Sequence, residues 1–167
     1  MKIALISDTH ATGPTPWMQA VYDRYLAKAD LLLHMGDMTS KELWSFFMQH
    51  PGFHAVAGNM DEWSLSGELE TRLSMTVEGG LRIGMMHGFG LSGRPLSGAV
   101  AQAFGPDYDL LCFGHTHEPA WIDYDGVRVA NPGSLRETGK APTLAYVHVA
   151  ADGTMTRELV QVPREMG

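Results

Sequence analysis

The sequence predicts an α/β fold in which two sheets pack together with helices outside them. Short apolar runs recur along the chain, and most are separated by helical or turn-rich stretches. In the first half, stretches with helical periodicity lie between the apolar runs, as in parallel sheets. In the second half, most of the runs are separated by residues typical of hairpin turns. The length of 167 residues and the 44% hydrophobic content fit one domain over residues 1–167.

Three strands and two helices are expected in the first half. The first helix has Thr15 as a cap and Pro16 in its first turn, with apolar residues at helical intervals. Pro51 and Gly52 end the second helix. The expected elements are strand Ile3–Ser7, helix Pro16–Lys28, strand Leu31–His34, helix Ser40–Gln49 and strand Phe53–Ala57.

Hairpin signals dominate the second half. Gly79-Gly80 predicts a two-residue turn, and Asp125-Gly126 and Asp152-Gly153 mark two further hairpins, so turn chemistry explains these acidic residues. An antiparallel second half is therefore expected. Its elements are strands Leu73–Glu78 and Leu81–Met86, helix Leu96–Phe104, and strands Asp109–Phe113, Trp121–Tyr124, Val127–Ala130, Thr143–Val149 and Thr154–Val162.

Composition excludes several classes of function. The net charge of −7 disfavours stable binding to duplex nucleic acid, although bound metal ions could still attract a phosphorylated substrate. The single cysteine, Cys112, cannot form an internal disulfide and is expected to be a small buried hydrophobe. No signal peptide or membrane-spanning stretch is found, so a cytoplasmic location without membrane association is expected.

Polar side chains follow five of the expected strands directly. In α/β sheets, loops at the carboxyl ends of strands converge around ligands. Singly, each of these residues except the pair His115 and His117 is more often a turn or structural residue, but together they form a pattern. The residues are Asp8 and His10, Asp37, Asn59, His87, and His115 with His117.

The residue types and spacings point to a metal site. On extended backbone, side chains two residues apart project to the same side, so Asp8 with His10, and His115 with His117, could each offer two ligands. Nitrogen and oxygen ligands without thiolates favour Mn, Fe, Zn, Co or Ni. Glycines 36, 58, 88 and 114 would allow the backbone to approach closely.

This ordered set resembles the calcineurin-like metallophosphoesterase superfamily over roughly the first 120 residues. The short chain, the stretch Leu33–Asp37 and the turn Asn131–Ser134 are similar to the small bacterial and archaeal phosphodiesterases of the YfcE type. The resemblance implies a four-layer α/β/β/α sandwich of two mixed sheets. It also implies metal-dependent cleavage of phosphodiester bonds in a small-molecule or nucleotide substrate.

The resemblance further implies a dinuclear centre, most simply with two Mn²⁺ ions and with Fe, Zn, Ni or Co as alternatives. Asp37 would bridge the ions, and Asn59 and His87 would also be catalytic by stabilising charge on the phosphoryl oxygens, while the ions activate a water between them. Proton competition should weaken metal loading below about pH 6. One ion would be held by Asp8, His10, Asp37 and His117, and the other by Asp37, Asn59, His87 and His115.

One position departs from the pattern. Larger members of the superfamily have a histidine after Gly-Asn as a general acid, and small ones often have a cysteine, whereas this chain has Met60, which cannot donate a proton. General acid catalysis is worth about 10²–10⁴-fold. Two alternatives therefore stay open: a scaffold protein of the same fold, as in a retromer subunit, and a phosphomonoesterase. A homo-oligomer is also compatible with the sequence.

For several other residues the sequence suggests a role at the site and a structural role side by side. His34 is either a support for a ligand or a structural histidine, and Asp61 either bonds a ligand histidine or caps the next segment. Arg94 and Arg136 are candidates for phosphate contact. Three residues could line a pocket for a nucleobase or aryl group, but ordinary packing is the expected role for each of them. They are Met38, Met60 and Trp63. No functional role is expected for His50, His54 and His148.

Overall fold

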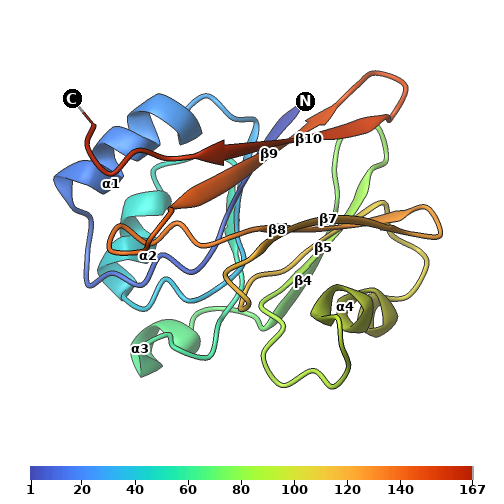
Figure 1. Ribbon diagram of the computed structural model, residues 1–167, viewed down its shortest axis with the longest axis horizontal. Helices are drawn as coiled ribbons and strands as arrows, with labels where there is room; N and C mark the ends of the chain where they lie inside the picture. The colour runs from blue at the N-terminus through green and yellow to red at the C-terminus, as the bar shows by residue number, and fades with distance from the viewer. Residues whose placement is uncertain (167) are drawn as a thin grey trace.

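The computed structural model describes residues 1–166 and contains two five-stranded sheets with helices on both outer sides (Figure 1). The first sheet has the order β10-β9-β1-β2-β3 and the second the order β4-β5-β6-β8-β7. The expected four-layer α/β/β/α sandwich of two mixed sheets is confirmed. The strands are β1 Lys2–Ile6, β2 Leu31–His34, β3 Phe53–Ala55, β4 Arg72–Thr76, β5 Arg82–Met86, β6 Leu110–Cys112, β7 Pro119–Tyr124, β8 Val127–Pro132, β9 Thr143–Val149 and β10 Met155–Gln161.

Helices cover the two outer faces. They are α1 Pro16–Val21, the π-helical turn η1 Tyr22–Leu26, α2 Lys41–Phe47, α3 Trp63–Ser66 and α4 Leu96–Phe104. The first apolar cluster joins α1, η1 and α2 to the first sheet, and another joins α4 to the second sheet. The third lies between the sheets and includes the fully buried Leu5, Leu33 and Cys112. Cys112 is thus a small core hydrophobe, and burial raises the pKa of its thiol.

The expected parallel pairing of the first half is confirmed, whereas the expected antiparallel second half is wrong for its central strands. In the first sheet β1, β2 and β3 are parallel, but β9 and β10 return to complete this sheet in antiparallel pairing. In the second sheet β5, β6 and β8 are parallel, and only the edge strands β4 and β7 are antiparallel to their neighbours. Hairpin turns reveal only pairs joined by short loops, whereas distant pairs form when the sheets assemble.

The helix signals were largely correct. The Thr15 hydroxyl accepts from the Met18 N–H and the Ser40 hydroxyl from the Leu43 N–H, both at 3.1 Å, so each caps a helix. The first helix widens into η1, where the Ala27 N–H donates to the Tyr22 carbonyl. The short helix α3 was not expected. Within residues 1–166, no helix is both long and apolar enough to cross a bilayer.

One turn differs from its prediction. The loop between β4 and β5 is closed by a hydrogen bond of 2.9 Å from the Val77 N–H to the Leu81 carbonyl, so three residues rather than two lie between the paired positions. Gly79 and Gly80 both have positive φ, at 88° and 83°, which explains the two glycines.

Candidate metal centre

The loops after β1, β2, β5 and β6 meet at one edge of the sandwich. The Asp8 N–H donates to the Gly36 carbonyl at 3.0 Å and the His10 N–H to the Asp37 carbonyl at 3.1 Å, so the loops after β1 and β2 run side by side. In the second sheet the Gly114 N–H donates to the His87 carbonyl at 3.1 Å, which joins the loops after β5 and β6. Backbone bonding therefore holds the predicted site residues close together.

The backbone at this edge is left-handed rather than extended. Seven non-glycine residues among residues 1–166 have positive φ, and five of them are predicted ligands. Left-handed backbone is disfavoured for such residues and persists where the surrounding structure holds it. The extended backbone expected at Asp8 with His10 and at His115 with His117 is therefore wrong, although the side chains do converge. The five residues are Asp8 (54°), His10 (43°), Asp37 (59°), His115 (68°) and His117 (61°).

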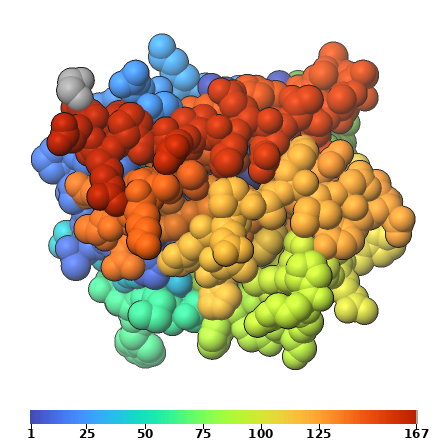
Figure 2. Space-filling model, viewed as in Figure 1, coloured from blue at the N-terminus to red at the C-terminus, as the bar shows by residue number. Residues whose placement is uncertain are grey.

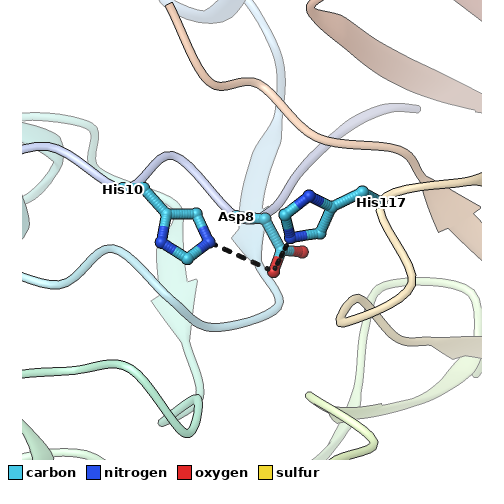
Figure 3. Close-up of side chains that lie close together, drawn as sticks. All are labelled: Asp8, His10 and His117. Atoms are coloured by element: carbon cyan, nitrogen blue, oxygen red, sulfur yellow. Dashed lines mark ion pairs between the residues drawn. The ribbon is translucent and has the colours of Figure 1, made fainter. Parts of the chain in front are cut away.

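The first group of side chains contains Asp8, His10 and His117 (Figure 3). Asp8 is fully buried, and its Oδ1 lies 3.2 Å from His117 Nε2 and 3.8 Å from His10 Nε2. Figure 3 shows the two imidazoles on either side of this carboxylate. The other oxygen, Oδ2, accepts from the Ser7 hydroxyl at 2.5 Å and from the His115 N–H at 3.1 Å. The Asp8 carboxylate is thereby oriented with Oδ1 toward the imidazoles.

The second group is built around Asp37 and His87. His87 Nε2 lies 3.2 Å from Asp37 Oδ2, 3.9 Å from Asp8 Oδ1 and 3.3 Å from His115 Nδ1. Asp37 Oδ1 accepts from the Met60 N–H at 2.7 Å, while Oδ2 also lies 3.7 Å from His10 Nε2. Asp37 therefore stands between the two groups, although Asp8 also borders both.

Asn59 is the predicted ligand that these contacts do not include. It is exposed, and no hydrogen bond of its side chain occurs within residues 1–166. The structure thus brings six of the seven predicted residues together and leaves the Asn59 amide on the rim.

Two buried atoms at the centre fit a cation. Asp8 Oδ1 and His10 Nε2 are buried without a hydrogen-bond partner, which costs about 1–3 kcal/mol per group if nothing binds them. His87 Nδ1 lies 2.7 Å from the Met35 carbonyl, so it donates there and leaves the Nε2 lone pair facing the carboxylates. Carboxylate oxygens and imidazole lone pairs around one space match a divalent transition metal.

The charges of the buried groups are coupled. Burial raises the pKa of Asp8 and of Asp37, but nearby imidazoles and hydrogen-bond donors outweigh it, so both carboxyl pKa values lie below the ordinary range. Burial likewise lowers the pKa of His87, yet the Asp37 and Asp8 carboxylates outweigh it and raise this pKa overall. Two buried anions in contact with imidazoles make the centre attractive to cations.

Glycines allow the loops to pack against the carboxylates. A Cβ at Gly58 would collide with the side chain and backbone nitrogen of Asp37, and a Cβ at Gly114 would meet the Ser7 hydroxyl and the Asp8 carboxylate. Close approach was the expected reason for both glycines, and the structure shows the atoms that require it.

His34 and Asp61 tie loops together rather than contact ligand side chains. The Gly36 N–H donates to His34 Nδ1 at 3.1 Å, so the proton lies on Nε2, which donates to Thr9 Oγ1 at 3.0 Å. Burial lowers the pKa of His34 to about 3, so this imidazole is neutral. Asp61 accepts from the Thr39 N–H at 2.8 Å and the Gly58 N–H at 2.6 Å, which matches neither role expected for it.

Asn131 holds the loop that carries His115 and His117, a role that its place in the turn signature did not reveal. Its buried amide donates to the Gly114 carbonyl at 3.0 Å and to Thr116 Oγ1 at 3.1 Å, and its carbonyl accepts from the Gly133 N–H. The signal that could have identified it is a polar side chain at the end of an apolar strand, β8.

Of the residues considered for phosphate or ring binding, Met38 is buried, whereas the others reach the surface or line a hollow. Met38 is fully buried in the core, as expected, but Met60 and Trp63 are 59% and 92% exposed, so packing is the wrong role for them. Arg94 is exposed and donates to the Gly93 carbonyl at 2.8 Å. Arg136 lies at a hollow of about 300 Å³ that also includes His10.

A larger groove of about 780 Å³ includes His115 and shares no lining residue with the hollow at His10. Its walls come from the segment after β5, with Phe89, Leu91 and Arg94, and from β7 with Ile122. Figure 2 shows these two stretches of chain, yellow-green and gold to orange, next to each other on one face. Phe89 was missed because a lone aromatic between two glycines has no periodic signal.

Comparison with known proteins gives consistent results. Residues 1–152 match the model of the calcineurin-like phosphoesterase superfamily domain. A "probable metallophosphoesterase" of Mycoplasma pneumoniae is 30% identical over 177 residues, covering 98% of this chain and 99% of that protein.

Solved structures share the fold. Zinc-bound Vps29 from Entamoeba histolytica has a TM-score of 0.72 at 22% identity, covering 96% of this chain and 99% of that chain. An archaeal phosphodiesterase has a TM-score of 0.70 at 20% identity, with 96% and 100% coverage. At these identities the likeness concerns the architecture alone.

Proposed function

This chain belongs to the calcineurin-like phosphoesterase superfamily, and we propose that it is a metal-dependent hydrolase of phosphodiesters. The observation that carries the proposal is the pair of buried, unpartnered atoms, Asp8 Oδ1 and His10 Nε2, at the meeting point of loops from both sheets. A cation held there would satisfy both atoms and would also moderate the repulsion between the buried carboxylates of Asp8 and Asp37.

We assign two divalent ions to the centre, with Mn²⁺ as the expected metal and Fe, Zn, Ni or Co as alternatives. Asp8, His10 and His117 would hold one ion and Asp37, His87 and His115 the other, with Asp37 between them and Asn59 free to turn inward from the rim. Bound divalent ions supply Lewis-acid chemistry, because they lower the pKa of water and neutralise charge on phosphoryl oxygens.

The protein's own contribution is positioning. The Met35 carbonyl fixes the tautomer and direction of His87, and Ser7 and the His115 N–H fix the Asp8 carboxylate. His87 is only 3% exposed, which favours a role as a ligand. The exposed Asn59 amide is the better placed of the two proposed catalytic residues to donate a hydrogen bond to a phosphoryl oxygen.

Two features favour diesters over monoesters. The groove at His115 and the hollow at His10 adjoin different parts of the centre, which provides room for the two ester groups of a diester. Met60 carries no proton for a leaving group, and its contribution to the centre is a backbone N–H bonded to Asp37. We therefore expect good leaving groups to react best.

The test uses chelator-treated protein and a chromogenic aryl phosphodiester. Turnover should require Mn²⁺, exceed that of the matching aryl monoester, and fall at least about 100-fold on His115→Ala, because a metal ligand is lost. His148→Ala is the matched control, since the His148 side chain is 43% exposed and is paired with Glu158. Full turnover without any divalent ion would refute the proposal.

A scaffold role without catalysis is the second candidate, and Met60 at the general-acid position is the observation that favours it. In that case the centre would bind metal with the same ligands, but no phosphodiester would be hydrolysed. Metal binding measured by calorimetry beside the turnover assay separates the two candidates.

A further inference from the structure

We propose that the groove beside His115 binds a heteroaromatic ring, such as a nucleobase, carried on one ester arm of the substrate. The inference rests on the proposed function and names the class of substrate for that site. It assigns the groove to a nucleotide ester rather than to an alkyl or lipid phosphodiester.

The groove is continuous with the metal centre. His115 belongs to both, because it lines the groove and its Nδ1 lies 3.3 Å from His87 Nε2. A phosphoryl group held at the centre would therefore have an ester arm at the entrance of the groove. The volume of about 780 Å³ lies within the range of small-molecule sites.

Phe89 provides an aromatic surface inside this groove. It is 64% exposed, and its ring lies 5.8 Å from the His115 ring at an interplanar angle of 69°. Gly88 and Gly90 on either side have φ values of 101° and 82°, a backbone that a larger residue would adopt with strain. An exposed aromatic ring next to a metal ligand is a stacking platform for a planar group.

The remaining walls distinguish a heteroaromatic ring from a purely apolar one. Ile122 on β7 is 37% exposed and lines the groove together with Leu91. Arg94 and Glu118, both exposed, add a guanidinium donor and a carboxylate acceptor. A nucleobase has a planar apolar face and polar edges, and it can use all three kinds of contact.

The experiment is a calorimetric titration of the Mn²⁺-loaded protein with adenosine 5′-monophosphate and ribose 5-phosphate. The two probes share the phosphate and sugar, so their affinity ratio reports the base alone. We expect the nucleotide to bind about tenfold more tightly, since a base that stacks on an aromatic side chain adds to the affinity.

Phe89→Ala should remove most of this preference and leave ribose 5-phosphate binding unchanged, and Ile122→Ala should reduce it in part. Leu159→Ala is the control, because Leu159 is a similarly exposed apolar residue, 41%, on the distant strand β10. Trp63→Ala tests the other exposed aromatic side chain, and loss of the preference there instead would overturn the assignment.

The outcomes separate this inference from the proposed function. Equal affinity for both probes, together with turnover of a chromogenic diester, would refute the assignment of the groove to a heteroaromatic ring. The proposed hydrolase activity would still be supported. No turnover of any diester would refute the hydrolase, and the titration would still decide what the groove binds. Thermal unfolding of each variant checks that it is folded, and the high exposure of Phe89 makes folding of its variant expected.

Discussion

The two sheets contribute different chemistry to the same centre. The first sheet supplies the carboxylates of Asp8 and Asp37, which are 0% and 2% exposed, whereas the second supplies His115 and His117, both exposed. Buried charge is costly unless it is held by fixed donors, and both carboxylates accept backbone N–H groups. We therefore expect the buried groups, which are the two carboxylates of the first sheet and His87 of the second, to set the affinity for a cation, while His115 and His117 form the side that a substrate approaches.

The two contributions are linked through one carboxylate. Asp8 follows a strand of the first sheet but accepts the N–H of His115, which follows a strand of the second. Ser134, after β8, also donates to the Asp8 carbonyl at 2.9 Å. The centre therefore exists only when the sheets are packed, and substitutions in one sheet at a time separate the two contributions.

The largest expected effect comes from removing a ligand of each sheet. Asp37→Ala should weaken Mn²⁺ binding more than about 100-fold, because ligand loss should exceed the 10–100-fold typical of supporting residues. His117→Ala should cost only about tenfold, since its side chain is 43% exposed and water can replace it. Calorimetry on chelator-treated protein measures both, and equal losses would contradict the proposed division between the sheets.

A glycine substitution tests the close packing on the first-sheet side. Gly58→Ala should destabilise the protein by about 1–3 kcal/mol, because its Cβ would meet Asp37 atoms that have little room to move. Gly67→Ala is the control: Gly67 has φ −72°, and its nearest neighbour would be 3.6 Å away. Urea unfolding should show a change within about 0.5 kcal/mol for the control. A stable Gly58→Ala protein would show that the loop can rearrange.

Supporting residues of the two sheets should have similar effects, each smaller than that of Asp37→Ala. Asp61→Ala loosens the loops after β2 and β3, and Asn131→Ala loosens the loop that carries His115 and His117. Each should lower Mn²⁺ affinity about tenfold. Asp123→Ala removes a comparable bond, to the Gly126 N–H in a hairpin turn, and should leave the affinity unchanged. If the control had the same effect, a general loss of stability would explain all three.

The smallest expected effect is a pH dependence from His34 of the first sheet. This imidazole is neutral in the folded protein, with a pKa lowered to about 3, but titrates near 6.5 when unfolded. The unfolded state therefore binds more protons, and stability falls as the pH falls below about 7. Between pH 7 and pH 6 the loss is about 0.7 kcal/mol. His34→Gln should remove this part of the slope in urea unfolding; an unchanged slope would contradict a neutral His34.

Local signals in the sequence were sufficient for most elements of the fold. Helix caps at Thr15 and Ser40, the hairpin residues of the second half and the apolar runs each depend on neighbouring residues, and the structure has them close to the expected places. The four-residue helix α3 has no such periodicity. The pairing of β9 with β1, which returns β9 and β10 to the first sheet, has no local signal either. It depends on which strand edge is still unpaired when the sheets assemble.

The sequence by itself determined which residues stand at the strand ends, because each carboxylate, amide or imidazole group directly follows an apolar run in the amino-acid order. Only the tertiary structure decided how they face each other: five predicted ligands have left-handed backbone, and Asp8 borders both groups. The groove with Phe89 was also decided there, since its walls come from segments about 30 residues apart. The physical reason is that side-chain direction at a loop depends on backbone strain and packing that distant segments impose.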